Sequence, residues 1–382
     1  MFDVSIVPCA SYDPAVCRVA LLQVLQPLGG LDFVTPGMRI AVKANLVSAL
    51  RPEKAATTHF ALLGALADLL TARGAEVVIG DSPGGLYSAP FVENVYRVAG
   101  LEPLERPGVR LNRDFSQKTA RFPAGKAARE FQYTGYLDNC DVLIDFCKLK
   151  THGMMGLSAA AKNLFGTIPG TRKPEYHFQY PDPRDFARML VDLNEYWKPR
   201  LSIVDAVEAM EGNGPTAGTP RHVGALIAGL SPHRTDLFCA DLIGLSRQAV
   251  PTLEAAFERG LIPACAAELS VTGDASTLRV PDFRSAGAQR SHLFSGALPG
   301  KLGQAQTRLL QQLIGSRPQV SRAACIGCGK CAEICPARAI SMAHKVPKID
   351  RHACIRCFCC QEFCPMGAMK VHRAPIARLL NR

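Results

Sequence analysis

The chain has 382 residues, is 48% hydrophobic and carries a formal net charge of +11, so it is long enough for two or three domains with buried cores. Its first residues contain no basic segment and no long apolar run, so we expect neither an export signal nor a membrane-spanning helix. Fifteen cysteines without a secretory context are typical of a protein of the reducing cytoplasm.

Strands and helices are predicted to alternate along residues 1–285. Apolar runs predict strands at 3–8, 39–42, 76–79, 141–146, 201–204 and 224–227. Capping residues and helical spacing, with Thr57 or Thr58 as the cap of the second helix, predict helices at 13–28, 57–72, 90–99, 157–164, 185–197 and 235–245. This alternation is typical of a doubly wound α/β domain with a mainly parallel sheet.

The composition changes after residue 285. Residues 286–317 are rich in Ser, Gly, Ala and Gln, and we interpret them as a linker that includes a helix at 302–314. Residues 318–372 are predicted to form a second, small domain that contains most of the cysteines. Residues 373–382 are interpreted as a basic tail.

Polar residues follow several predicted strands at the point where each strand ends. Open α/β sheets bind ligands outside the carboxyl ends of their strands, so these residues are expected to form one site if the strands are parallel. The residues concerned are Lys43 and Asn45, Asp81 and Ser82, Lys148, Lys150 and His152, and Asp205.

Two roles are predicted for this site. Alternate residues of an extended segment share a face, so Lys148, Lys150 and His152 are expected to point the same way. These three and His177 are candidate catalytic residues, which would orient a substrate and supply protons. The lysines favour a small anionic substrate or cofactor. The candidate substrate-binding residues are Lys43, Asn45, Asp81, Ser82, Lys162, Asn163 and Asp205.

Each candidate also has a plainer interpretation. Lysines at strand ends are often solvated, and residues 81–85 have the composition of an ordinary turn. The glycines of that turn could equally present backbone N–H groups to an anion. His177 could simply be packed or exposed. The sequence contains no Walker loop and no dinucleotide fingerprint.

Four segments of the α/β region carry a family resemblance. They are VKANLV at 42–47, GDSPGG at 80–85, KLKTHGMMGLSAAAKNLFG at 148–166 and DAVEAMEGNGP at 205–215. Over about residues 35–245 the chain resembles the family catalogued as domain of unknown function 362, which is often fused to a ferredoxin module. Ser231 stands where that family usually has an acidic residue before Pro232, whereas Asp236 fits. The resemblance implies little about chemistry, because the family's reaction is not generally established.

Two cysteine motifs of the same form occur near the end of the chain. Each has the spacing C-x2-C-x2-C-x3-C-P, which resembles a bacterial-type two-cluster ferredoxin of α+β fold. In such modules the fourth ligand of each 4Fe-4S cluster comes from the opposite motif. We therefore expect two 4Fe-4S clusters. One is assigned to Cys325, Cys328, Cys331 and Cys364, and the other to Cys354, Cys357, Cys360 and Cys335.

Structural zinc is the plainer interpretation of these cysteines. Zinc sites are usually built from separate pairs of Cys or Cys/His, whereas two complete triads, each followed by x3-Cys-Pro, are typical of iron-sulfur clusters. Cys359 has no place in either set of four ligands. It is interpreted as a spectator thiol, and an exchange with Cys360 stays open.

The charge is concentrated in the second domain. Residues 318–382 contain eleven Lys and Arg but three Asp and Glu. Anionic clusters partly offset this excess of positive charge. The sequence has no stripe of interleaved basic and aromatic residues, so we do not expect nucleic-acid binding. We expect an acidic electron donor or acceptor protein as partner.

Two functional hypotheses follow. The first is an iron-sulfur oxidoreductase that delivers electrons from the clusters to an anionic substrate or cofactor held by the α/β domain. The second is a non-enzymatic, ferredoxin-like carrier or assembly partner whose α/β domain docks a protein.

Overall fold

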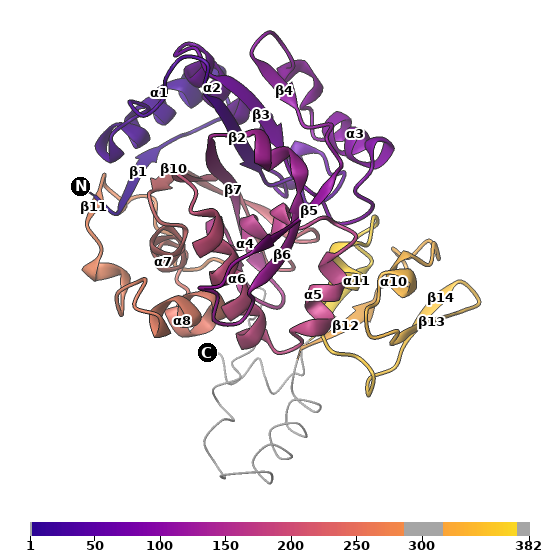
Figure 1. The fold of residues 1–382 in the computed structure, drawn as a ribbon. Coiled ribbons are helices and arrows are strands. Elements are labelled where there is room, and N and C mark those ends of the chain that lie inside the picture. Colours follow the sequence, from indigo (N-terminus) through magenta and orange to yellow (C-terminus); the bar gives the residue numbers. More distant parts are fainter. Residues whose placement is uncertain (1, 286–315, 373–382) are drawn as a thin grey trace.

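The computed structural model describes residues 2–285 and 316–372 (Figure 1). A nine-stranded sheet forms the centre of the larger domain, in the order β11-β1-β10-β9-β7-β2-β3-β4, with β8 paired to β7. The strands are β1 (Val4–Pro8), β2 (Arg39–Ala44), β3 (Glu76–Gly80), β4 (Val109–Leu111), β7 (Val142–His152), β8 (Gly156–Ser158), β9 (Leu201–Glu211), β10 (Thr219–Gly229) and β11 (Val271–Thr272).

The sheet is mixed but mainly parallel, as predicted. Strands β4, β3, β2, β7 and β9 run parallel to their neighbours in this row. Strand β10 is antiparallel to both β9 and β1. Because β2, β3 and β7 are parallel, their carboxyl ends meet at one edge of the sheet, where the sequence places its polar residues.

Helices cover both faces of the sheet, and each face has its own apolar core. Helices α1 (Pro14–Leu25), α2 (Phe60–Thr71) and α3 (Ala89–Val98) pack on one face. The opposite face is covered by α4 (Ala160–Asn163), α6 (Pro183–Trp197), α7 (Pro232–Leu242) and α8 (Pro251–Glu258). The doubly wound prediction is therefore confirmed. A separate hairpin is formed by β5 (Gln117–Arg121) and β6 (Glu130–Thr134), and α5 (Lys173–Gln179) follows the short helix α4.

Several local predictions differ from the structure. Strand β7 continues to His152, so the residues expected in a loop after the strand belong to the strand itself. The helix predicted at 157–164 is β8 followed by the single turn α4. His59 caps α2 instead of Thr57 or Thr58, because the Thr58 hydroxyl donates to the carbonyl of Phe146. The hairpin β5–β6, α5 and α8 were not predicted, and the helix predicted at 302–314 lies outside the described residues.

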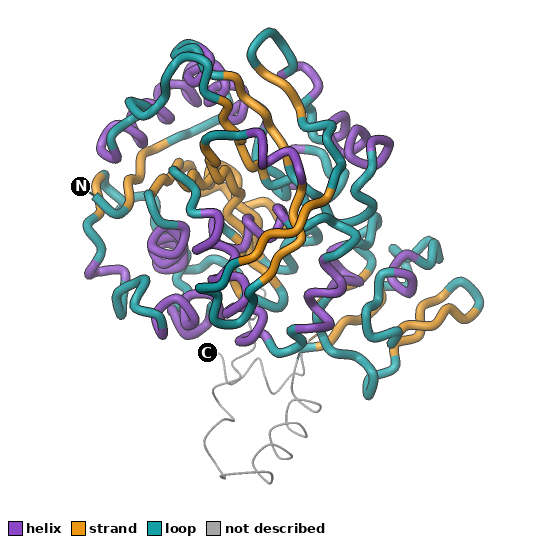
Figure 2. Tube along the Cα trace, in the orientation of Figure 1, coloured by secondary structure: helices purple, strands orange, loops and turns teal. Residues whose placement is uncertain are grey.

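The C-terminal lobe is a small α+β unit, as predicted (Figure 2). It contains two short antiparallel ladders and two single-turn helices, one helix in each cysteine motif. The ladders are β12 (Arg317–Val320) with β15 (Met369–His372), and β13 (Ile340–Ala343) with β14 (Val346–Ile349); the helices are α10 (Lys330–Glu333) and α11 (Cys359–Glu362).

The second cysteine motif faces the α/β domain. Gln361 Nε2 donates to the carbonyl oxygens of Asn213 and Gly214, at 2.9 and 3.1 Å. Phe358 is buried in the core of the α/β domain although its φ is +62°, a backbone conformation that costs a bulky residue about 1 kcal/mol or more. The corresponding residue of the first motif is Gly329. Both residues have positive φ, but only the second motif places a side chain here, and that side chain anchors the lobe.

Candidate functional site

A small cavity lies where the sheet edge meets the lobe. Its volume is about 40 Å³, room for about three water molecules. Polar and charged side chains dominate its wall. The lining residues are Asn45, Val47, Asp81, Gly84, Lys150, His152, Ser158, Lys162, Asn163, Phe165, Gly166, Lys173, Pro215 and Glu362.

Lys43, Asp81 and Asn163 form a buried network beneath the cavity. The Lys43 amine lies 2.7 Å from Asp81 Oδ1 and donates to Asn163 Oδ1 at 3.1 Å and to the carbonyl of Ala44 at 2.7 Å. Its three N–H groups are thus occupied, because an ammonium has three donors. Lys43 therefore stabilises the wall instead of facing a substrate.

Gly166 allows this network to close. A Cβ at residue 166 would lie 2.2 Å from Asp81 Oδ1 and 2.4 Å from Lys43 Nζ. Real Cβ contacts are longer than this, so only glycine fits without displacing the ion pair. The close approach also brings the carbonyl of Gly166 to the backbone N–H of Ser82.

Lys150 and Asn45 form the second polar pair of the wall. The Lys150 amine donates to Asn45 Oδ1 at 2.6 Å and to the carbonyl of Ala56 at 2.7 Å. Complete burial lowers the pKa of Lys150 to about 7. At neutral pH this amine is therefore close to half protonated, which suits a group that gives or takes a proton.

Lys162 and Lys173 bring two further amines to the cavity. Within the described residues, no hydrogen bond reaches the Lys162 amine, which lies 4.7 Å from the centre of the Phe165 ring. Burial lowers its pKa, and the Glu362 carboxylate opposes that shift. The Lys173 amine donates to the carbonyl of Ser82, and burial lowers its pKa to about 8. Lys162 is thus the amine best placed to meet an anion.

His152 and Glu362 connect the two domains at this cavity. His152 Nδ1 accepts from the backbone N–H groups of Met154 and Met155, at 3.1 and 3.2 Å. The proton of the neutral ring must then sit on Nε2, which lies 2.9 Å from Glu362 Oε1. Burial lowers the pKa of His152, whereas the contact with His152 and the charge of Lys162 hold the pKa of Glu362 well below its usual range.

Lys148 and Asp205 lie apart from the cavity, contrary to the prediction of one shared face. The register between β7 and β9 shifts between Lys148 and Lys150, so simple alternation fails here. The Lys148 amine lies 2.8 Å from Asp205 Oδ2 and donates to the Tyr12 hydroxyl at 2.6 Å. Tyr12 in turn donates to Asp205 Oδ1 at 2.9 Å. These three residues form a separate network, in which Lys148 and Asp205 are buried and Tyr12 is half-buried.

His177 and Ser82 also lie outside the cavity wall. The His177 ring stacks on Phe186 at 4.4 Å between ring centres, and burial lowers its pKa to about 3. The ring is therefore neutral and packed, which matches its plainer interpretation. The Ser82 hydroxyl accepts from the backbone N–H of Gly170 at 2.7 Å and holds the loop that leads to α5.

The cysteine geometry fits 4Fe-4S binding. The four cysteines assigned to the first cluster, Cys325, Cys328, Cys331 and Cys364, line one common cavity. Cys335 Sγ and Cys364 Sγ each accept a backbone N–H, from Ala339 and Ala368, at 3.2 Å. Hydrogen bonds of this kind stabilise cluster thiolates and tune their reduction potential.

The second set of cysteines is more buried than the first. Cys357 and Cys360 are buried, whereas Cys328 is exposed. Burial raises the pKa of Cys360 well above its usual value, and the nearby sulfurs of Cys357, Cys354 and Cys335 raise it further. Across the residues that the structure describes, no three Cys, His, Asp or Glu side chains converge on a point that could hold one metal ion. A cubane does not require such convergence, because each thiolate binds a different iron.

Three residues of the cavity and of the neighbouring Lys148 network were missed by sequence reasoning. Glu362 lies between Cys360 and Cys364, and nothing in its spacing points to a site in the other domain. Lys173 lies in an unpredicted helix, and Tyr12 reaches Lys148 from the amino-terminal end of the chain. The repeated motif offers one signal, since Glu362 and Glu333 occupy the same position of the two motifs.

Comparisons with known proteins confirm the family resemblance of both parts of the chain. The family described as "Domain of unknown function (DUF362)" matches residues 40–241, and a "4Fe-4S dicluster domain" matches residues 317–365. "Thylakoid-associated protein sll1697" of Synechocystis sp. is 33% identical over 276 residues, which cover 70% of this chain and 82% of the relative. The C-terminal module is thus a 4Fe-4S, ferredoxin-type domain.

Two solved structures show a distant likeness. One is the lactate racemase apoprotein of Thermoanaerobacterium thermosaccharolyticum, at 12% identity and a TM-score of 0.42, and the other is a protein of Thermotoga maritima, at 14% identity and a TM-score of 0.39. The matches cover 64% and 62% of this chain, but the chain spans only 58% and 60% of those two structures. Within the described residues, no helix has the length and apolar character needed to span a membrane.

Proposed function

The chain belongs to the DUF362 family and carries a 4Fe-4S ferredoxin-type module, and we propose that it is an iron-sulfur oxidoreductase. In this proposal electrons from the lobe reach an anionic group held in the cavity at the sheet edge. When bound, a 4Fe-4S cluster supplies single electrons. The two clusters and the two sets of four cysteines assigned from the sequence are part of the proposal.

The contact between His152 and Glu362 carries this proposal. Glu362 ends the helix that contains Cys359 and Cys360, and its carboxylate forms part of the cavity wall. His152 is the last residue of strand β7 and contacts Glu362 from the α/β domain. A group bound in the cavity would therefore contact the second cysteine motif directly, through Glu362, which favours electron transfer between them.

The cavity residues take distinct roles in the proposal. Lys162 and Lys150 attract the anion by charge, and Asn45 orients Lys150. Lys150 supplies a proton as electrons arrive, because burial places its pKa at about 7. The volume of about 40 Å³ fits a carboxylate or another small oxyanion, so only the anionic end of a larger substrate would enter.

A reoxidation screen tests the proposal. Protein reduced with dithionite under anaerobic conditions, and freed of excess reductant, is mixed with small oxyanions and with carboxylates that contain a reducible group. We expect at least one class to restore the cluster absorbance faster than buffer, and we expect Lys162→Met to slow this step about tenfold or more. Lys54→Met, which removes an exposed lysine outside the cavity, serves as the matched control. The proposal fails if no anion reoxidises the protein faster than buffer.

The alternative function, a carrier or assembly partner without a reaction of its own, is favoured by one observation. The cavity is small, and Lys43, Asp81 and Asn163 already satisfy one another. The buried network would then serve to lock the lobe onto the α/β domain. This alternative gains if Lys150→Ala and His152→Ala leave electron delivery to a purified acceptor protein unchanged.

Location and domain limits also belong to the proposal. We propose a cytoplasmic protein, with an α/β domain at 1–285 and a ferredoxin domain at 318–372. The name of the cyanobacterial relative places that relative at thylakoids. Most of the proposed linker at 286–317 and all of the tail at 373–382 lie outside the described residues.

A further inference from the structure

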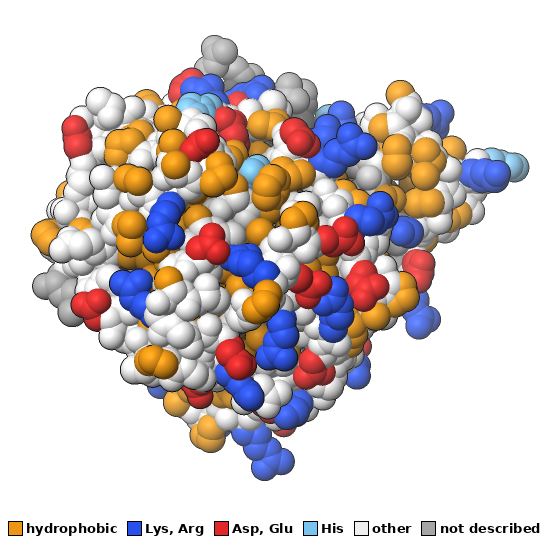
Figure 3. Space-filling model, turned by 90° about the horizontal axis from the view of Figure 1, so that it is seen from above, with side chains coloured by type: hydrophobic (Ala, Val, Ile, Leu, Met, Phe, Trp, Pro, Cys, Tyr) orange, Lys and Arg blue, Asp and Glu red, His pale blue; other side chains and the backbone are white. Residues whose placement is uncertain are grey.

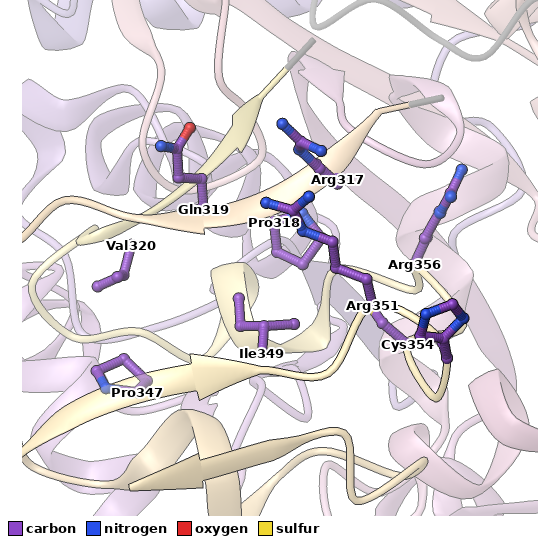
Figure 4. Close-up of a pocket in the computed structure, with 10 residues that line it drawn as sticks. Arg317, Pro318, Gln319, Val320, Pro347, Ile349, Arg351, Cys354 and Arg356 are labelled. Carbon is purple, nitrogen blue, oxygen red and sulfur yellow. The ribbon is translucent and has the colours of Figure 1, made fainter. Parts of the chain in front are cut away.

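A second pocket lies on the lobe (Figure 4) and shares no lining residue with the cavity at the sheet edge. Its volume is about 330 Å³, near the lower limit of pockets that hold small ligands or a few side chains. Residues from β12, β14 and the start of the second cysteine motif surround it. They are Arg317, Pro318, Gln319, Val320, Pro347, Ile349, Arg351, His352, Cys354 and Arg356.

The wall of this pocket combines positive charge with an apolar floor. Figure 4 shows the side chains of Arg317, Arg351 and Arg356 on one side, and those of Val320, Pro347 and Ile349 on the other. No Asp or Glu occurs among its described lining residues. The nearest acidic residue in the sequence is Asp350, whose carboxylate accepts from the backbone N–H groups of His352 and Ala353.

The surface of the lobe around the pocket also carries an excess of positive charge. Residues 316–372 contain nine Lys and Arg but three Asp and Glu, and one of these acids, Glu362, is turned toward the α/β domain. Seen from above, the projecting lobe carries mainly basic and hydrophobic side chains (Figure 3). Such a surface steers an acidic molecule toward the pocket.

Cys354 connects the pocket to a proposed cluster. This cysteine is one of the proposed ligands of the second cluster, and it lines the pocket. A molecule seated among the arginines therefore lies next to a cluster ligand. The same cysteine motif contacts the sheet-edge cavity through Glu362, so the two pockets flank one motif.

No side chain of the undescribed segments can supply the complementary negative charge. Residues 286–315 and 373–382 contain no Asp or Glu. A carboxylate that pairs with Arg317 or Arg351 must therefore come from elsewhere on this chain's surface, from a second copy or from another protein. Six of the nine Lys and Arg residues of 316–372 lie outside the pocket lining, so the positive charge is spread beyond the pocket, which favours a protein over a small anion.

We propose that this arginine pocket is the docking site for an acidic segment of the electron-donor protein. A carboxylate of the donor pairs with Arg317 and Arg351, and an adjacent apolar side chain of the donor contacts Val320 and Ile349. Electrons then enter the lobe at Cys354 and leave it on the side of Glu362. The inference rests on the proposed function, which sets the direction of electron flow from the lobe to the sheet-edge cavity.

The test compares two charge reversals on neighbouring residues. Arg351 lines the pocket, whereas Lys348 is exposed and lies on β14 between Pro347 and Ile349, so its side chain points to the opposite face. Binding of an octaglutamate peptide and the rate of cluster reduction by a reduced acidic flavodoxin are measured in Arg351→Glu, Lys348→Glu and the unmodified protein. We expect Arg351→Glu to weaken both about tenfold or more at low salt, and Lys348→Glu to have a much smaller effect. High salt should remove most of the difference.

Several outcomes would overturn the inference. These are equal effects of the two variants, displacement of the peptide by millimolar inorganic phosphate, and self-association of the chain that Arg351→Glu abolishes. Arg351→Gln, which removes the charge without reversing it, replaces Arg351→Glu if that variant loses its clusters. The readout is reduction of the lobe, which needs neither Lys150 nor Lys162, so a failure here is distinguishable from a failure of the proposed reaction.

Discussion

His152 Nε2 lies 2.9 Å from Glu362 Oε1, and this contact joins the last residue of a sheet strand to the helix of a cysteine motif. The two backbone N–H groups at Nδ1 leave Nε2 as the protonated nitrogen. Glu362 is also the nearby negative charge that opposes the pKa shift of Lys162. One carboxylate therefore stabilises the domain contact and balances the charge of the cavity.

Replacement of Glu362 by alanine should loosen the domain contact. The variant leaves the Nε2–H of His152 and the buried charge of Lys162 without their partner, which should cost about 2–3 kcal/mol. We expect faster hydrogen exchange in α11 and in the residues after β7, measured by mass spectrometry under anaerobic conditions.

Glu333→Ala is the matched control for this variant. Glu333 has the same position in the first motif but is exposed, so its loss should leave hydrogen exchange in both regions unchanged. Equal effects of the two substitutions would show that the contact of Glu362 with His152 has no special role.

Replacement of Gly166 by alanine should disrupt the cavity wall. The new Cβ would meet Asp81 Oδ1 and Lys43 Nζ at 2.2 and 2.4 Å, so the buried ion pair must move. We expect a loss of stability of about 2–4 kcal/mol, visible as a lower melting temperature. Gly84 lines the same cavity, but the Cβ added by Gly84→Ala would meet its nearest neighbours at 3.4 Å, which is an ordinary contact. An equal loss in both variants would contradict the role given to Gly166.

Much of the site followed from the sequence, because parallel strands bring their carboxyl ends together. Lys43, Asn45, Asp81, Lys150 and His152 were predicted to meet, and they lie in or directly beneath one cavity wall. The prediction needed only the strand positions and the direction of the strands. Both depend on local apolar runs, which a single sequence reveals well.

The remaining features depend on contacts between distant parts of the chain. Lys148 turns away because the register of β7 and β9 shifts beside it, and Tyr12 and Asp205 satisfy its amine. Glu362 enters from the other domain. The small size of the cavity also had no sequence signal, since it results from how side chains fill the space.

The pKa of Lys150 predicts a pH dependence of stability. Burial lowers this pKa from 10.5 in the unfolded chain to about 7 in the folded protein. Between these values the unfolded state binds more protons than the folded state, so stability should rise with pH from about 7 toward 10, by at most about 1.4 kcal/mol per pH unit. The melting temperature of the unmodified protein should therefore rise relative to that of Lys150→Met over this range. A constant difference would show that Lys150 is not perturbed, and Lys54→Met controls for the loss of a surface amine.

The cluster assignment predicts different results for two adjacent cysteines. Cys360→Ala removes a proposed ligand, so the iron content should fall by about half. Cys359→Ala should keep all of its iron, because Cys359 belongs to neither set of ligands. Iron and acid-labile sulfide are measured on protein purified without oxygen. Loss of iron in Cys359→Ala with retention in Cys360→Ala would show that the two cysteines exchange roles.

A redox titration followed by electron paramagnetic resonance tests the central claim most directly, that an iron-sulfur centre lies against the cavity at the sheet edge. We expect two 4Fe-4S signals in the unmodified protein. We also expect Glu362→Ala, which removes a negative charge beside the second cysteine motif, to raise at least one reduction potential, whereas the exposed control Glu333→Ala should leave the potential of the centre at the cavity unchanged. A protein without iron-sulfur signals, or one in which Glu362→Ala shifts neither potential, would contradict the account.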